Sequence, residues 1–84
     1  FSQSREELLE LIDTGERLLK AKENNINAEE VKFILAIHYL QAMQQQLISK
    51  DEGQKKFKKL LTELRKEYPQ SLKPLTLEAL SPTP

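Results

Sequence analysis

The sequence predicts an all-α protein: a small antiparallel three-helix bundle over residues 1–69, followed by a tail over residues 70–84 that packs partly on it. Three observations favour this class. Apolar residues recur at helical spacing in three segments, and a helix-capping pattern precedes each of them. The connections between the segments are short, so successive helices should lie side by side and run in opposite directions.

The first helix is expected over residues 5–22, and Ser4 and Glu7 have the spacing of a capping box at its start. Gly15 lies inside the apolar stripe of this helix, where it costs about 1 kcal/mol relative to alanine. Its position predicts that a neighbouring helix approaches closely there, and a kink at Gly15 is the alternative. The other members of the stripe are Leu8, Leu11, Ile12, Leu18 and Leu19.

The second helix is expected over residues 28–49, with Asn27 as its cap and Ile26 packing on Val31 as a hydrophobic staple. Its apolar residues form two stripes, which need cover from two directions, so this helix should be central. The first stripe contains Phe33, Ala36, Ile37, Leu40, Met43, Leu47 and Ile48, of which Phe33, Ile37 and Leu40 are expected in the core. The second stripe contains Val31, Leu35, Tyr39 and Ala42, with Ile34 and His38 at its edge.

The third helix is expected over residues 53–68. A polar break precedes it, in which Asp51 and Gln54 offer a cap, and Pro69 ends it because the residue before a proline is driven out of the helical region. Its apolar stripe contains Phe57, Leu60, Leu61, Leu64 and Tyr68.

The tail is too rich in leucine for a free linker, and residues 76–80 could form one extra helical turn. Its apolar residues are Leu72, Leu75, Leu77 and Leu80. The second stripe of the central helix would otherwise be exposed, and such a patch must be covered. We expect the tail to cover it, and a second copy of the chain is the alternative.

The composition excludes several classes of protein. The chain has 13 lysine and arginine residues against 13 aspartate and glutamate residues, so no global field attracts nucleic acid or a membrane surface. It has no cysteine, which excludes thiol catalysis and cysteine-ligated zinc. A reducing cytosol fits this composition, as does export of a cysteine-free chain, and we expect a cytoplasmic location.

His38 is the single histidine, and its helical neighbours offer no metal ligand or catalytic partner. The residues one turn away are Ile34, Leu35, Gln41 and Ala42. We interpret His38 as a semi-buried structural residue, with a pH-sensitive interface residue as the alternative. Phosphate-binding glycine motifs are absent from the sequence as well. The sequence therefore predicts no enzyme, no catalytic residue, no cofactor and no metal.

The clearest charge pattern is a basic strip on the third helix, formed by Lys55, Lys59 and Lys66 opposite its apolar stripe. The first helix carries an acidic face, with Glu6, Glu7, Glu10, Asp13 and Glu16. One interpretation is mutual steering of the two helices together with solubility. The alternatives are docking on an acidic protein or on an anionic membrane surface, while a nucleic-acid partner lacks stacking aromatic residues and net positive charge.

These patterns predict a non-enzymatic protein-interaction module or regulator that binds a protein partner through the second helix, the third helix or the tail. The size and layout resemble those of bacterial immunity and antitoxin-like proteins, a likeness of architecture that implies regulation by binding a protein. A homodimer, or docking of the basic third helix on nucleic acid or an anionic membrane, is the alternative. The candidate partner-binding residues are Lys55, Lys59, Lys66, Val31, Leu35, His38 and Tyr39.

Overall fold

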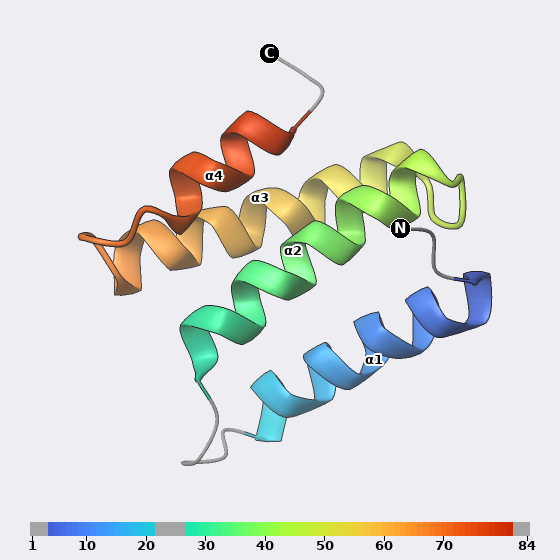
Figure 1. Cartoon of the computed structure of the whole chain (residues 1–84), viewed down its shortest axis with the longest axis horizontal. Coiled ribbons are helices and arrows are strands. Elements are labelled where there is room, and N and C mark those ends of the chain that lie inside the picture. Colours follow the sequence, from blue (N-terminus) through green and yellow to red (C-terminus); the bar gives the residue numbers. More distant parts are fainter. Residues whose placement is uncertain (1–3, 22–26, 82–84) are drawn as a thin grey trace.

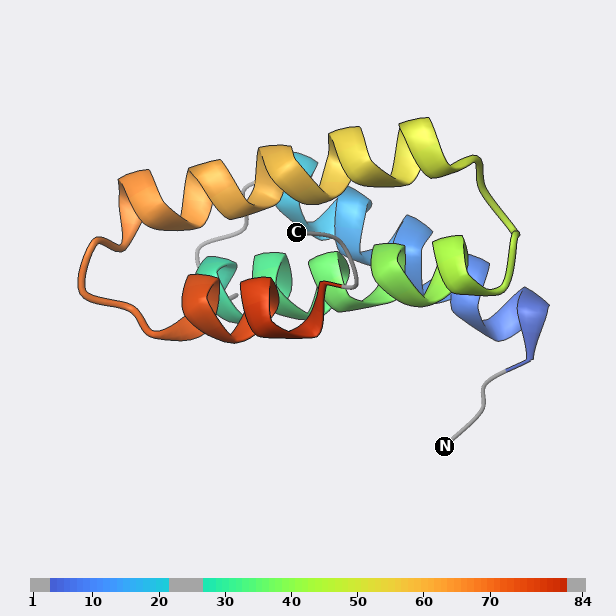
Figure 2. The ribbon, with the colours of Figure 1, turned by 90° about the horizontal axis from the view of Figure 1, so that it is seen from above.

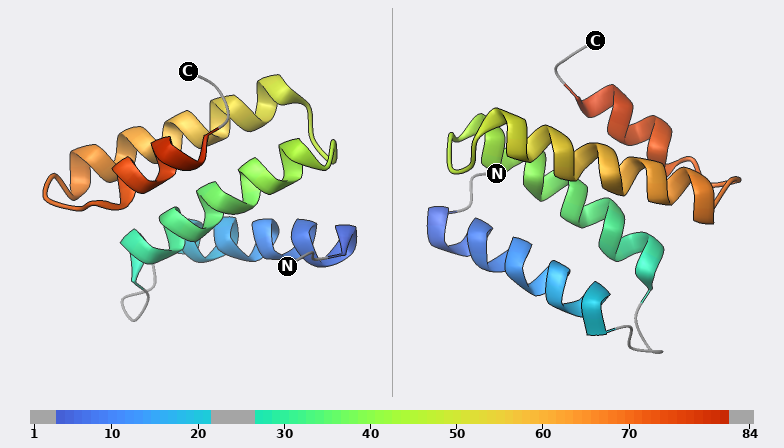
Figure 3. Two further views of the ribbon diagram at one scale, coloured as in Figure 1. Left: turned by 45° about the horizontal axis from the view of Figure 1, so that its top comes forward. Right: turned by 180° about the vertical axis from the view of Figure 1, so that it is seen from behind.

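The computed structural model describes residues 4–21 and 27–81, which contain four α-helices. They are α1 (Arg5–Ala21), α2 (Ala28–Gln44), α3 (Lys50–Glu67) and α4 (Lys73–Leu80). All regular secondary structure in these ranges is helical, which confirms the predicted all-α class. The backbone of α2 contacts each of the other three helices, whereas that of α1 contacts α2 alone among the described helices. Accordingly, α1 and α4 lie on opposite sides of the α2–α3 pair (Figures 1 and 3).

Two helix starts agree with the capping patterns in the sequence. At the start of α1, the backbone N–H of Glu7 donates to Ser4 Oγ at 3.2 Å, and that hydroxyl donates to Glu7 Oε1 at 2.9 Å. At the start of α2, the N–H of Glu30 donates to Asn27 Oδ1 at 3.1 Å. The predicted staple with Ile26 lies outside the described residues.

The end of α2 corrects the prediction, since the helix stops at Gln44 rather than at residue 49. The N–H of Leu47 donates to the carbonyl of Ala42 at 2.9 Å, and the N–H of Gln46 donates to that of Met43 at 3.0 Å. Together with the φ of 62° at Gln46, these bonds form a Schellman motif, which ends helices. Glycine usually occupies the left-handed position of this motif, so the glutamine at this position did not indicate in the sequence that the helix ends there.

The start of α3 is corrected as well. Ser49 is the cap, because its Oγ accepts from the N–H of Glu52 at 3.1 Å, and the helix begins at Lys50 rather than at residue 53. Asp51 therefore lies in the first turn, where an acidic residue suits the helix dipole. The extra turn brings Gly53 inside the helix, where a Cβ would collide with Cγ and Sδ of Met43. Glycine at this position lets α3 begin close against the end of α2.

The tail forms a longer helix than the single turn expected, with Pro74 in the first turn of α4, where a missing N–H costs nothing. Figure 2 shows α4 alongside the first half of α2. Pro74 and Leu77 are the buried residues of α4, and Lys73 Nζ lies 5.7 Å from the ring centre of Phe33 on the first stripe. Lys73 also lies 3.5 Å from Glu30 Oε2, which ties α4 to the start of α2.

The second stripe of α2 is covered by α1, so the prediction that the tail covers it is wrong. Leu35 and Tyr39 are each only 3% exposed, and the phenol of Tyr39 donates to Glu16 of α1. A Cβ on Gly15 would lie 3.1 Å from Leu35 Cδ1, which confirms the close helix approach predicted at that glycine. Ile34 at the edge of the stripe stays 41% exposed.

The core joins all four helices, and Leu40 belongs to it as predicted, while Phe33 and Ile37 are only partly buried against it. Among the described residues, Leu8, Leu64 and Leu77, from three different helices, have the largest fully buried side chains. The buried hydrophobic residues are Leu8, Ile12, Leu35, Ala36, Tyr39, Leu40, Ala42, Phe57, Leu60, Leu61, Leu64 and Leu77.

Candidate functional site

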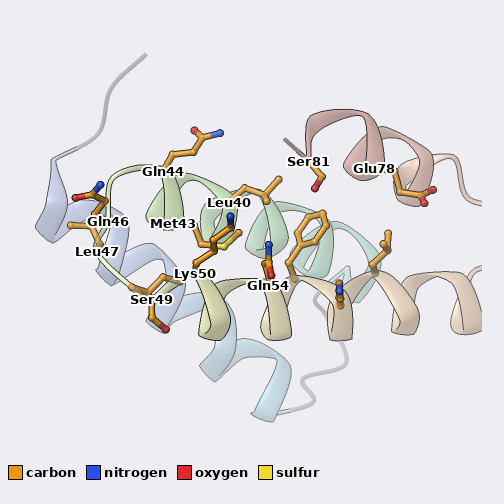
Figure 4. A pocket seen from close by; sticks show the side chains of 14 residues that line it. Leu40, Met43, Gln44, Gln46, Leu47, Ser49, Lys50, Gln54, Glu78 and Ser81 are labelled. Carbon is orange, nitrogen blue, oxygen red and sulfur yellow. The ribbon is translucent and has the colours of Figure 1, made fainter. Parts of the chain in front are cut away.

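An open apolar groove runs between α2 and α3 beyond the last turn of α4, with a volume of about 1340 Å³. Figure 4 shows Glu78 of α4 and Ser81, which directly follows α4, at one end of this α2–α3 groove and Leu47 near the other. Its apolar lining consists of Leu40, Met43, Leu47, Ile48, Phe57 and Leu61, and its polar lining includes Gln44, Gln46, Ser49, Lys50, Gln54 and Lys58.

The groove follows from the difference in helix lengths. α4 has 8 residues, whereas α2 has 17 and α3 has 18. At 1.5 Å per residue, α4 covers about 12 Å of a helix pair that is about 26 Å long. Within residues 4–21 and 27–81, no helix lies over the part of this face that is next to the α2–α3 connection (Figure 2).

The free charges beside the groove are basic. Lys50 and Lys58 are exposed, and neither forms an ion pair with any other residue that the structure describes. The carboxylate of Glu78 is engaged, since its Oε1 lies 2.5 Å from Arg65 Nη2. An occupant of the groove would therefore meet an apolar floor and a positive rim on α3.

Lys32 is a structural cation rather than part of this groove. Its Nζ donates to Glu67 and lies 3.4 Å from Glu63 Oε1, so it joins α2 to α3. Burial alone would lower the pKa of Lys32, but the contacts with Glu67 and Glu63 outweigh burial and raise the pKa above its ordinary value. This cluster was not predicted, although a lysine inside the apolar run of α2 was a signal for it.

The predicted partner-binding residues fall into two groups. Lys55, Lys59 and Lys66 are exposed, as the basic strip requires, but they do not line the α2–α3 groove. Lys59 borders a smaller groove of about 380 Å³ between α1 and α3, whose lining includes Tyr39. The predicted electrostatic steering between α1 and α3 does not involve a direct ion pair, because none joins the two helices in the described part of the chain.

The four candidates on α2 offer little exposed surface. Leu35 and Tyr39 are buried under α1, so their selection as surface contacts was wrong. Val31 and His38 are half-buried. Burial lowers the pKa of His38, so the imidazole is neutral near pH 7. The groove residues of α3, Lys50, Gln54 and Lys58, were missed because the sequence does not show where α4 ends.

Two further classes of site are absent from the described residues. No group of three or more histidine, cysteine, aspartate or glutamate side chains there could hold a metal ion. None of the helices in these ranges is long enough and apolar enough to cross a bilayer.

Tyr39 predicts a loss of stability at alkaline pH. Burial and then the hydrogen bond to Glu16 raise the pKa of Tyr39, whereas an unfolded tyrosine titrates near pH 10. The unfolded state therefore loses its proton first, and the stability contributed by Tyr39 is complete below pH 10 and decreases as the pH rises further. The raised pKa of Lys32 has the same consequence, because an unfolded lysine loses its proton at about pH 10.4 while the folded one retains it. The stability contributed by Lys32 therefore also decreases as the pH rises above that value.

We expect the free energy of unfolding of the wild type to decrease above about pH 10, by up to ~1.4 kcal/mol per pH unit for each group. Tyr39→Phe removes one of these groups, so its free energy of unfolding should decrease less steeply. Urea titrations from neutral pH to about pH 11 measure both slopes. Parallel slopes for the two proteins would show that Tyr39 titrates alike in the folded and unfolded chain.

Comparison with known proteins found no match for this chain among family models, curated proteins or solved structures.

Proposed function

We propose that this chain is a non-enzymatic protein-interaction module that binds a protein partner in the α2–α3 groove. In this proposal α1, α2 and α3 act as an antiparallel bundle, with the tail helix α4 packed on it as one wall of the site. The main observation that supports this proposal is the groove itself, an apolar channel of about 1340 Å³ with polar residues along its edges. A concave, mainly apolar surface with a polar rim is typical of sites where proteins bind other proteins.

The arrangement of the groove also favours a macromolecular occupant over a small metabolite. The groove has a volume of about 1340 Å³. Small-molecule sites are usually clefts or cavities of ~300–1,000 Å³ that bury most of the ligand. Gln44, Gln46 and Gln54 offer amide donors and acceptors at its edges. Such a lining suits a peptide segment with one apolar side and one polar side.

The basic strip of Lys55, Lys59 and Lys66 contributes in this proposal to the rate of association. It lies outside the groove and carries no ion pair within residues 4–21 and 27–81. Unpaired positive charge near a site speeds encounter with an acidic partner and does so less as salt is added. A regulator of the immunity or antitoxin-like kind, acting in the cytoplasm, is one biological form that this module would fit.

The test places a photo-cross-linking amino acid at Gln54, which lines the groove, or at Thr62, an exposed residue of the same helix outside it. Irradiation in extract from the source cells should give one discrete adduct from position 54 and none from position 62. The captured protein, identified by mass spectrometry and purified, should bind the wild type and bind Leu47→Asp at least about tenfold more weakly, because a charge in an apolar interface is costly.

Two outcomes would contradict the proposal. Equal capture from positions 54 and 62 would mean that the groove does not select its occupant. Equal affinity of the purified partner for the wild type and for Leu47→Asp would move the binding site away from the groove. Circular dichroism of Leu47→Asp provides the control for folding, since Leu47 is only partly buried.

A further inference from the structure

We propose that the α2–α3 groove binds an acidic amphipathic helix of a partner protein, which lies end to end with α4 and repeats the contacts of α4 one heptad further along α2 and α3. This inference rests on the proposed function and specifies the chemistry of the partner. It is drawn from the way in which the chain already fills the first part of the same α2–α3 face with a helix of its own.

The contacts of α4 give the pattern. Leu77 is fully buried and belongs to the same core cluster as Leu64 of α3. The next residue, Glu78, forms an ion pair with Arg65 of α3 at 2.5 Å. A leucine followed directly by a glutamate thus places an apolar side chain in the core and a carboxylate beside α3.

The α3 surface repeats this pattern one heptad earlier. Phe57 stands seven residues before Leu64, and Lys58 stands seven residues before Arg65, so each pair lies on the same side of the helix. One heptad corresponds to about 10 Å along a helix axis. Phe57 and Lys58 line the open groove, where Lys58 would stand in the same relation to an occupant as Arg65 does to Glu78 of α4.

The α2 surface repeats in the same way. Phe33, which lies under Lys73 of α4, is followed at heptad spacing by Leu40, whereas Leu47 lies in the α2–α3 connection just beyond the end of α2. Leu40 and Leu47 both line the open groove. The two helices therefore offer a second helix position of the same apolar character immediately beyond the end of α4 (Figure 4).

The charges of this second position select an acidic occupant. Lys58 has no ion pair with any described residue, whereas its heptad equivalent Arg65 is paired with Glu78. Lys50 adds a second exposed cation at the far end. A carboxylate one heptad beyond Glu78 would meet Lys58 as Glu78 meets Arg65.

The near end of the groove sets the direction of the occupant. The last turn of α4 lies there, and the C-terminal end of a helix carries partial negative charge. The N-terminal end of a helix is positive, so an occupant that runs in the same direction as α4 places opposite partial charges together. The occupant should therefore continue the line of α4, with its N-terminus near Ser81.

The experiment uses the full chain and a fluorescein-labelled two-heptad peptide that repeats the Leu-Glu step of α4. A matched peptide has glutamine in place of each glutamate. Fluorescence anisotropy at low salt should give saturable binding of the glutamate peptide and at least about fivefold weaker binding of the glutamine peptide, because an exposed charge pair is lost.

Two lysine variants locate the contact. Lys58→Glu should weaken binding of the glutamate peptide by about tenfold, since an attraction becomes a repulsion. Lys20→Glu makes the same change of charge at an exposed residue of α1, outside the groove and outside the basic strip, and should leave the affinity within about twofold. A peptide with lysine in place of glutamate should bind Lys58→Glu more tightly than it binds the wild type.

Three results would overturn the inference. One is equal affinity for the glutamate and glutamine peptides, and a second is an equal effect of Lys58→Glu and Lys20→Glu. The third is a concentration-dependent dimer in sedimentation velocity that Leu47→Asp dissociates, because the occupant would then be a second copy of this chain. If the peptides fail while position 54 captures a protein, the chemistry assigned to the occupant is wrong but the proposed function stands.

Discussion

Leu64→Ala is expected to remove most of the stability of the protein. Leu64 is fully buried on α3 and belongs to the cluster that includes residues of all four helices. Replacing such a leucine by alanine costs about 2–5 kcal/mol, through lost burial and the cavity that remains. A chain of 84 residues has a total stability of only about 5 kcal/mol, so the variant should retain at most about 3 kcal/mol and unfold at a much lower urea concentration than the wild type.

Urea denaturation followed by circular dichroism measures the loss, and Leu9→Ala is the matched control. Leu9 is 44% exposed on α1, so the same chemical change there should cost less than about 1 kcal/mol. If the two variants unfold at the same urea concentration, Leu64 does not occupy the centre of the core, and the packing of α3 against the other helices is wrong.

The fold class and the starts of two helices were predictable because they depend on local chemistry. Ser4 and Asn27 are caps whose hydrogen bonds reach only three residues along the chain, so their spacing in the sequence is sufficient. The close approach at Gly15 was also predictable, since a glycine that weakens a helix inside its apolar stripe is typical of a site where another helix comes near.

The α2–α3 boundary was not predictable from the apolar pattern. Leu47 and Ile48 continue the helical spacing of α2, but the Schellman motif at Gln46 ends the helix before them. Glutamine has no special preference for a left-handed backbone, so the sequence carried no glycine or asparagine signal there. The start of α3 was predicted too late for a similar reason, because Ser49 and Asp51 are both good caps and the sequence does not show which of them is used.

The helical periodicity of the sequence does not determine which helix covers which stripe of α2, because this depends on tertiary packing. The sequence shows that α2 needs cover from two directions, and both α1 and the tail have apolar residues to offer. The structure places α1 over Leu35 and Tyr39 and places α4 on α2 and α3, near Phe33. The basic strip was predictable because all its residues lie on one helix. The groove was not predictable, because it depends on where α4 ends along α2 and α3.

Tyr39→Ala is expected to have the second large effect, and a local one. Tyr39 is buried at the α1–α2 contact, and its phenol donates to Glu16 of α1. Removing a buried aromatic ring costs about 3–5 kcal/mol. Because the backbone of α1 contacts α2 alone among the described helices, α1 should separate before the other helices unfold.

Native-state hydrogen exchange distinguishes this local opening from global unfolding. In Tyr39→Ala, the amides of α1 should exchange much faster than in the wild type, while those of α3 keep more of their protection. Tyr39→Phe is the control, since it retains the ring and removes only the hydroxyl. Glu16 is exposed and is solvated when the bond is lost, so Tyr39→Phe should cost only about 1 kcal/mol. Equal loss of protection in α1 and α3 of Tyr39→Ala would show that α1 is held by more than its contact with α2.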